Sequence, residues 1–127
     1  MLKRHAIKTN EKGQTMVEMA IVLPVLLVIL IGIVQFGIAF NNYLTLTDAA
    51  RAGARKAVVS HSASTCISQV RASASDLKQS DLTVGCSSSW QHGDDVTVTA
   101  TYPYSLNVFG VVVANGRLNV TTTERVE

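Results

Sequence analysis

The sequence predicts an α+β protein, in which a long N-terminal transmembrane helix extends into a small exported domain with a short helix and about three antiparallel strands. The helix is predicted by residues 19–34, which contain no charged side chain and include twelve Ile, Val or Leu residues. The domain is predicted by residues 60–127, a polar half with short stretches in which apolar residues alternate with Thr. One apolar block excludes a multi-span channel, and a net charge of +2 is too small to indicate a nucleic acid as partner.

The apolar block is long enough to cross a membrane once it is extended to Phe40. Residues 19–34 alone would form a helix of about 24 Å, shorter than a hydrocarbon core of about 30 Å. Residues 19–40 give about 33 Å and add one polar residue, Gln35. A helix of a soluble protein is rarely apolar on every face over such a length. We therefore predict a transmembrane helix over residues 14–40, with a local kink at Pro24 because proline lacks a backbone N–H.

A basic leader precedes this helix over residues 1–13. The leader holds four Lys or Arg residues and one acid, which gives it a charge of +3. Because the net charge of the chain is +2, the remaining residues carry a charge of −1. No Lys or Arg lies within ten positions after Phe40. Because positive charge stays in the cytoplasm, we predict a cytoplasmic N-terminus and an exported C-terminal half. A cleaved secretory signal that releases a soluble domain near Ala39 fits less well, since its apolar region is usually roughly 7–15 residues long.

Residues 41–59 continue the helical pattern and form the predicted helical extension. Its apolar side chains share one face: Tyr43, Leu46, Ala50, Ala54, Ala57 and Val58. Asp48 and Arg51 make an i,i+3 pair elsewhere on the helix, while Asn41 and Asn42 are poor helix formers that can break it. Small residues at a spacing of four allow another element to approach closely: Ala49, Gly53 and Ala57. That element is either a helix of another subunit or the protein's own sheet.

The predicted exported domain covers residues 60–127. A short helix is indicated, with Thr65 as its N-cap, by apolar residues at suitable spacing: Ile67, Val70 and Ala74. Strands are predicted over three stretches: residues 81–86, 95–102 and 117–125. Asn115 and Gly116 are typical of a turn before the last strand. Residues 109–113 fit a further strand or a loop packed on the helix, and Trp90 is interpreted as a lid over the small core.

Cys66 and Cys86 are the only cysteines, and both lie in the half predicted to be exported. Because that compartment is oxidising, we predict a disulfide between them. Closing a loop of about twenty residues would contribute about 3 kcal/mol. The alternative is a metal site built with His61 and His92, although the sequence has no C-x-x-C pair. We therefore expect neither a metal nor another cofactor.

The sequence contains no motif of a known catalytic site. No G-x-S-x-G elbow, H-E-x-x-H pair or glycine-rich phosphate loop is present. The three histidines, His5 included, are scattered among polar residues, and Asp94 and Asp95 stand before a predicted strand as in a turn. We expect no catalytic residue, no enzyme activity and no small-molecule substrate.

Residues 13–18 read Gly-Gln-Thr-Met-Val-Glu and stand directly before the apolar block. They resemble the cleavage signal of type IV pilin-like precursors. Three segments also resemble, in order, the VEFALVLPV, GiieFG and AAReGAR segments of TadE-like proteins: residues 17–25, 32–37 and 49–55. This sequence differs from that family at three positions. Gln35 stands where an acid is common, Met19 where Phe is common, and Ala52 where Glu is common. The related TadF-like group shares a similar N-terminal pattern.

The resemblance implies a minor pilin, or pseudopilin, that takes part in assembly or initiation of a tight-adherence (Flp-type) pilus. It implies that a prepilin peptidase cuts between Gly13 and Gln14, which makes Glu18 the fifth residue of the mature chain. Glu18 would then neutralise the N-terminal amine of a neighbouring subunit. Glu18, Pro24 and the small-residue row are the expected helix-assembly residues.

The same resemblance places the protein in the bacterial inner membrane, or with the pilus outside the cell after processing. Its implied partners are the lipid bilayer, the prepilin peptidase, other pilin or pseudopilin subunits and the assembly platform. The alternative is a permanently anchored bitopic protein whose exported domain binds a ligand or the cell wall.

Overall fold

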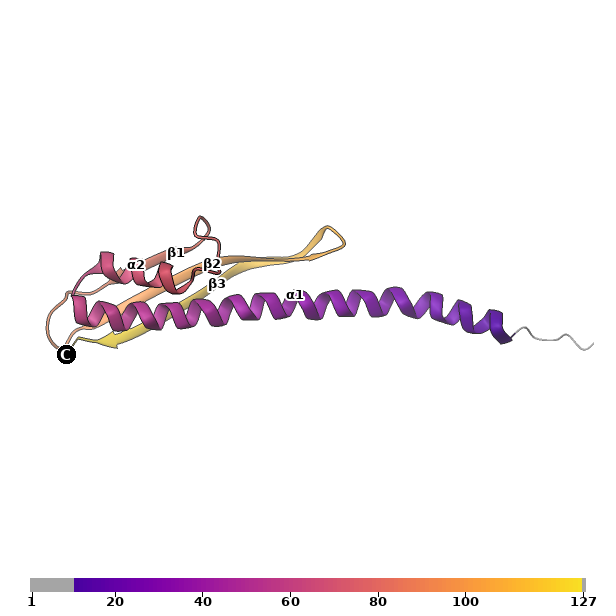
Figure 1. The fold of residues 1–127 in the computed structure, drawn as a ribbon, viewed down its shortest axis with the longest axis horizontal. Coiled ribbons are helices and arrows are strands. Elements are labelled where there is room, and N and C mark those ends of the chain that lie inside the picture. Colours follow the sequence, from indigo (N-terminus) through magenta and orange to yellow (C-terminus); the bar gives the residue numbers. More distant parts are fainter. Residues whose placement is uncertain (1–10, 127) are drawn as a thin grey trace, which may run out of the picture.

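The computed structural model describes residues 11–126 and has the predicted α+β layout (Figure 1). Residues 1–10, which make up most of the predicted leader, lie outside the described residues. The elements follow one another as α1 (Glu11–Ser60), α2 (Ala63–Ser73), β1 (Thr83–Ser87), β2 (Asp95–Val108) and β3 (Val111–Arg125). The last part of α1 packs with the other elements; we call residues 46–126 the C-terminal domain.

α1 is a single helix of 50 residues and is therefore about 75 Å long. It continues through Asn41 and Asn42, so these two poor helix formers do not break it. Helix propensity is a weak preference, and an apolar helical block before these residues and a packed helical face after them override it. α1 also continues through Pro24, and Figure 1 shows one gently curved helix without a sharp kink.

The core of the C-terminal domain lies between α1, α2 and the sheet. α1 contributes one face, as the apolar spacing predicted, and the buried cluster consists mainly of Ala, Val and Leu: Leu46, Ala49, Ala50, Ala54, Ala57, Cys66, Val70, Ala74, Leu77, Leu82, Val96, Val98, Ala100, Val120 and Val126. Trp90 packs against this cluster from outside, in keeping with a lid. The predicted ion pair between Asp48 and Arg51 is confirmed at 3.8 Å, on the exposed side of α1.

α1 and α2 approach each other closely at Gly53. A Cβ atom at Gly53 would overlap Cγ2 of Val70 and lie 3.3 Å from the carbonyl oxygen of Cys66. Gly53 is buried, as are Ala49 and Ala57 on either side of it. The small-residue row of α1 is therefore covered within the same chain, where the second helix packs closely at Gly53.

The sheet is antiparallel in the order β1-β2-β3, and its hairpin is longer than the sequence predicted. β2 continues six residues beyond Tyr102, and β3 begins at Val111 rather than at Arg117. The turn consists of Phe109 and Gly110, both with positive φ (50° and 83°), as a two-residue type I′ turn requires.

The expected turn at Asn115 and Gly116 is wrong. These residues lie within β3, where they pair with Ser105 and Tyr104 of β2. Apolar residues on both sides of the Phe109–Gly110 turn extend the ladder as far as the pair Val108 and Val111. The pairing of the two strands therefore outweighs the local preference of Asn-Gly for a turn.

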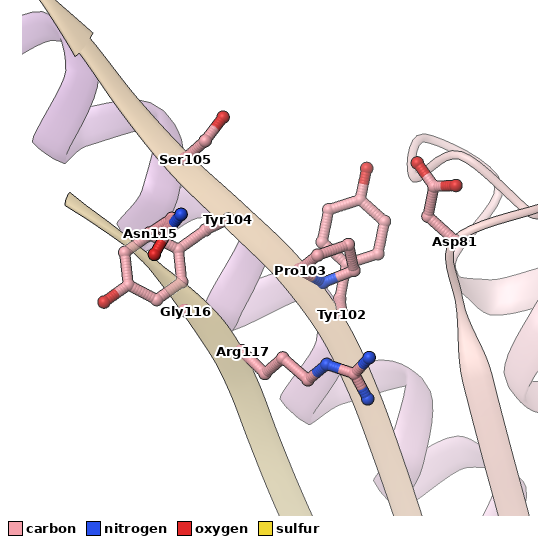
Figure 2. Close-up of a pocket in the computed structure, with 8 residues that line it drawn as sticks. All are labelled: Asp81, Tyr102, Pro103, Tyr104, Ser105, Asn115, Gly116 and Arg117. Carbon is pink, nitrogen blue, oxygen red and sulfur yellow. The ribbon is translucent and has the colours of Figure 1, made fainter. Parts of the chain in front are cut away.

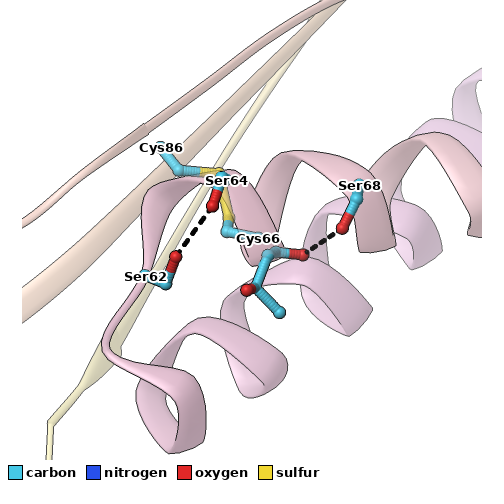
Figure 3. Close-up of a disulfide and its surroundings, with 6 residues drawn as sticks. Ser62, Ser64, Cys66, Ser68 and Cys86 are labelled. Atoms are coloured by element: carbon cyan, nitrogen blue, oxygen red, sulfur yellow. Dashed lines mark hydrogen bonds between the residues drawn. A yellow bond between two sulfur atoms is a disulfide. The ribbon is translucent and has the colours of Figure 1, made fainter.

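Two smaller boundaries also differ from the sequence predictions. α2 begins at Ala63 with Ser62 as N-cap, because Ser62 has extended backbone angles (φ −139°, ψ 123°), so Thr65 is already inside the helix. β1 ends at Ser87 and begins at Thr83, two residues later than predicted. Figure 3 shows Ser62 at this start, with its Oγ 2.9 Å from Oγ of Ser64.

Cys66 and Cys86 are joined by a disulfide that links α2 to β1 across a sequence separation of 20 (Figure 3). Cys66 is fully buried in the first half of α2, and Cys86 lies opposite Val98 in the sheet. The cross-link therefore ties the helical layer to the edge strand. Both sulfur atoms are used in this bond, so neither is available as a thiolate ligand of a metal.

Gly53→Val should destabilise the C-terminal domain by about 2–3 kcal/mol, because the added atoms overfill the contact with Val70 and Cys66. Urea unfolding of the detergent-solubilised chain, followed by fluorescence of its single tryptophan, measures the change. Gly37→Val is the matched control on α1, since nothing lies within 4 Å of a Cβ there. Equal stability of the two variants would contradict the close packing of α1 and α2.

Reduction of the disulfide should lower the free energy of unfolding by about 3 kcal/mol, since it frees a loop of about twenty residues in the unfolded chain. The same unfolding assay with and without reductant measures this loss. A chain carrying both Cys66→Ser and Cys86→Ser should match the reduced protein and ignore reductant. If reductant leaves the unfolding midpoint of the unaltered chain in place, the cross-link has no stabilising role.

Candidate functional site

Most of α1 is exposed in this structure; we call residues 14–44 the bare segment. Over residues 14–44 nearly every side chain is exposed, and none of the apolar window of the helix is buried inside the protein. The exposed large side chains include Met16, Ile21, Leu26, Ile33 and Phe36. A contiguous apolar surface of this size is unfavourable in water, so it marks a contact with lipid or with another protein. Its length and composition suffice to cross a membrane.

The predicted processing residues lie at the start of this bare segment. The peptide bond between Gly13 and Gln14 falls within the first turn of α1, since Gly13 stands two residues after Glu11. The Gln14 side chain donates a hydrogen bond from Nε2 to Oε1 of Glu18 at 3.2 Å. Both residues are exposed, so a carboxylate and the proposed cleavage point lie together in the first described turns of the helix.

The structure separates the predicted helix-assembly residues into two groups. Glu18 and Pro24 lie on the bare part of α1. Ala49, Gly53 and Ala57 are buried inside the C-terminal domain, where α2 packs on Gly53. Sequence reasoning left open which element covers this row, because small residues favour any close approach. The row is not an open surface for a further helix in the structure described here.

Two grooves run between α1 and the β2–β3 hairpin. The larger, of about 450 Å³, is mostly apolar and is lined by Phe36, Ala39, Phe40, Tyr43, Tyr104, Leu106, Arg117, Leu118 and Asn119. The smaller, of about 190 Å³, places Leu106 beside Gln35, Ile38 and Ala39 of α1. Hairpin and helix thus lie side by side at the level where the predicted transmembrane segment ends.

A third hollow, of about 550 Å³, lies between the hairpin and the loop before β1 (Figure 2). It is lined by Asp81, Tyr102, Pro103, Tyr104, Ser105, Asn115, Gly116 and Arg117. Figure 2 shows Asp81 and Ser105 far apart in the hollow, so the carboxylate is not placed to act as base for the hydroxyl. The Tyr104 ring lies against Gly116, where a Cβ would be 2.9 Å from it.

The remaining titratable residues form no cluster in the part of the chain that the structure describes. Within residues 11–126 no three His, Cys, Asp or Glu side chains gather in a way that could hold a metal ion. His61 is exposed directly after α1, where its backbone N–H donates to the carbonyl oxygen of Ala57 at 2.8 Å. His92 is exposed in the turn before β2.

The surface that sequence reasoning missed is the end of the hairpin. Residues 109–113 were expected as a further strand or a loop packed on the helix. They contain the turn and the start of β3, and Phe109, Val111, Val112 and Val113 are exposed instead of packed. The available signal was the absence of any charged residue from Val96 to Gly116, a stretch long enough for a full hairpin.

Comparison with known proteins places the resemblance on α1. Residues 13–55 match the family of TadE-like proteins. No curated protein and no solved structure matches the chain. The matched residues run from the proposed cleavage point, along the bare apolar helix, into the face that packs on α2. Over residues 13–55 the chain is therefore similar to TadE-like proteins.

Proposed function

We propose that the protein is a minor pilin, or pseudopilin, a non-enzymatic component in the assembly or initiation of a tight-adherence (Flp-type) pilus. One observation carries the proposal. The TadE-like segment covers the exposed apolar part of α1 and the part of α1 that leads from there into the domain. A family segment that lies mostly on an exposed apolar helix favours a role in lipid and in helix–helix contacts.

The proposed location is the inner membrane, crossed once by α1, with the N-terminus in the cytoplasm and the C-terminal domain exported. The basic residues before the apolar block support this orientation. The disulfide between Cys66 and Cys86 also supports it, since such bonds persist in oxidising compartments outside the cytoplasm.

A prepilin peptidase is the proposed processing enzyme, and the bond between Gly13 and Gln14 is its proposed site. The first turn of a helix lacks intrahelical partners for its N–H groups, so it unwinds at low cost for a peptidase. Removal of residues 1–13 would leave a new amine at Gln14, one helical turn from Glu18. In a membrane that amine needs a carboxylate partner, and Glu18 of a neighbouring subunit would supply it.

Contacts with other pilin subunits and with the assembly platform are assigned to the bare segment, residues 14–44. The buried row at Ala49, Gly53 and Ala57 is occupied by packing within the chain, so it stabilises each subunit instead of joining two. Glu18 and Pro24 remain exposed for contacts between subunits.

Gly13→Ala should block removal of the leader, because prepilin-type processing after residue 13 requires the glycine in this proposal. Mass spectrometry of the membrane-extracted protein would detect loss of residues 1–13 from the unaltered chain and an intact leader in the variant. Gly32→Ala is a matched control farther along α1, where a Cβ meets nothing within 4 Å. An intact leader in cells that make the pilus would instead favour the permanently anchored binding protein.

Glu18→Gln should leave cleavage intact but lower the pilus yield at least about tenfold, since loss of one partner of a desolvated charge pair costs about 3 kcal/mol or more. Sheared surface pili, quantified against cell mass, provide the measurement. Asp48→Asn removes a carboxylate from an exposed ion pair on the same helix and should have no effect. A normal pilus yield with Glu18→Gln would exclude the proposed contact with a neighbouring amine.

A further inference from the structure

We propose that the end of the β2–β3 hairpin, residues 106–114, inserts into the outer interface of the lipid bilayer that α1 crosses. We call these residues the hairpin tip. The protein would then contact the membrane twice, through its helix and through a hairpin from its domain. This inference depends on the transmembrane placement of α1 that the proposed function includes.

The tip carries four exposed apolar side chains, in contrast to the rest of the domain. Phe109 is 69% exposed, Val111 67% and Val113 64%, and Val112 is 52% exposed. Outside α1 these four are the only exposed large apolar side chains among the residues that the structure describes. An exposed apolar group with no charge near it in the chain is a typical contact surface. The surface that the tip contacts must therefore be apolar too.

The hairpin points back along α1 toward the apolar helix (Figure 1). Leu106 lies beside Gln35, Ile38 and Ala39 across the smaller groove. The strand continues from Leu106 to Phe109, which adds about 10 Å, or about seven residues of helix. The tip therefore reaches the level of about residue 30 of α1, beside the segment proposed to lie in lipid.

The depth of the tip follows from the length of the helix. A hydrocarbon core of about 30 Å corresponds to about twenty helical residues. Counted from Met16, the first apolar residue after Gln14 and Thr15, it ends near Gln35. The tip would then enter the bilayer by about 5–10 Å, the depth at which apolar faces of interfacial elements lie.

A shallow position also suits the open edges of the hairpin. β1 pairs with β2 only as far as Thr101, so beyond that residue β2 and β3 pair with each other and with no further strand of residues 11–126. Unpaired backbone groups are not tolerated against the hydrocarbon core. At the interface, water and headgroups can satisfy them, and only the apolar side chains enter the acyl region.

Aromatic and basic side chains lie between the tip and the core of the domain. Tyr43, Tyr104 and Arg117 line the larger groove, and Tyr102 lies with Arg117 beside the third hollow. Tyrosine is enriched at the level of the lipid headgroups, where its ring and hydroxyl meet different environments. Arg117 is the first charged residue after the uncharged stretch, and its long side chain can reach lipid phosphates. This arrangement favours a lipid surface over another apolar occupant.

The turn residue points to the same conclusion. Phe109 has a φ of 50°, a conformation in which Asn, Asp or Gly is usual at this position of a type I′ turn. Its side chain is mostly exposed. An aromatic residue that is unfavourable for the turn and adds little to the core is explained by burial of its ring in lipid.

Depth-dependent fluorescence quenching tests the proposal on the full chain. Val111→Cys is labelled with the polarity-sensitive dye NBD, while the native disulfide is kept, and reconstituted in vesicles of phosphatidylethanolamine and phosphatidylglycerol. Lipids carry a spin label either near the headgroup or near the methyl end of the acyl chain. We expect at least about twofold quenching by the first lipid and weaker quenching by the second, as interfacial depth requires.

Two control positions separate this proposal from the proposed function. A dye at Leu26, in the middle of the predicted span, should be quenched most by the methyl-end label. A dye at Gln91, an exposed residue of the loop between β1 and β2, should not be quenched by either. Val113→Asp in the Val111→Cys chain should reduce quenching at the tip, since both positions are exposed and the domain core is untouched.

The outcomes are distinguishable. Quenching at Leu26 without quenching at Val111 would overturn the hairpin insertion and keep the transmembrane helix. If the NBD fluorescence at Val111 rises with protein concentration and the spin-labelled lipids do not quench it, a second copy of the chain covers the tip. That result also overturns the proposal. Absence of quenching at Leu26 would overturn the transmembrane placement of α1, and with it both proposals.

Discussion

The close packing of α1 against α2 at Gly53 is the contact on which the rest of the domain depends. Because a hydrogen atom stands where other residues carry a side chain, Val70 and the backbone of Cys66 lie directly against α1. The α1 face beside it is built from alanines, and the valines of the sheet complete the core. With larger side chains on this face the two helices would separate, and so small a core would lose much of its buried apolar area. The domain therefore has no core without the end of α1.

Much of this fold could be predicted from the sequence, because α1 is specified by a long uncharged stretch and an apolar period of about 3.6 residues. The central part of β2 was also evident, since Val96, Val98 and Ala100 alternate with threonines. The errors concern places where a local signal competes with distant pairing. Asn41 and Asn42 did not break the helix, and Asn115 and Gly116 did not form the turn, because contacts elsewhere in the chain outweigh a preference of two residues.

The candidate site was predictable to a different extent in its two parts. The segment around Gly13 and Glu18 could be found because the motif and the apolar block are contiguous in the chain. The partner of the row at Ala49, Gly53 and Ala57 could not, because small residues permit close approach without specifying which helix approaches. The apolar hairpin tip escaped notice for a related reason. Val111–Val113 look the same in sequence whether they are buried or exposed, and only the register of the hairpin decides between them.

The continuity of α1 has a mechanical consequence. No flexible linker separates the bare apolar segment from the packed domain, since the same helix passes from Glu11 to Ser60 without a break. A pull on the domain is therefore transmitted along the helix axis to the apolar segment, and a twist of the domain rotates that segment by the same angle. In the proposed function, a subunit built in this way would leave the bilayer by translation along the axis of α1, and the domain would fix how the apolar surface is oriented about that axis.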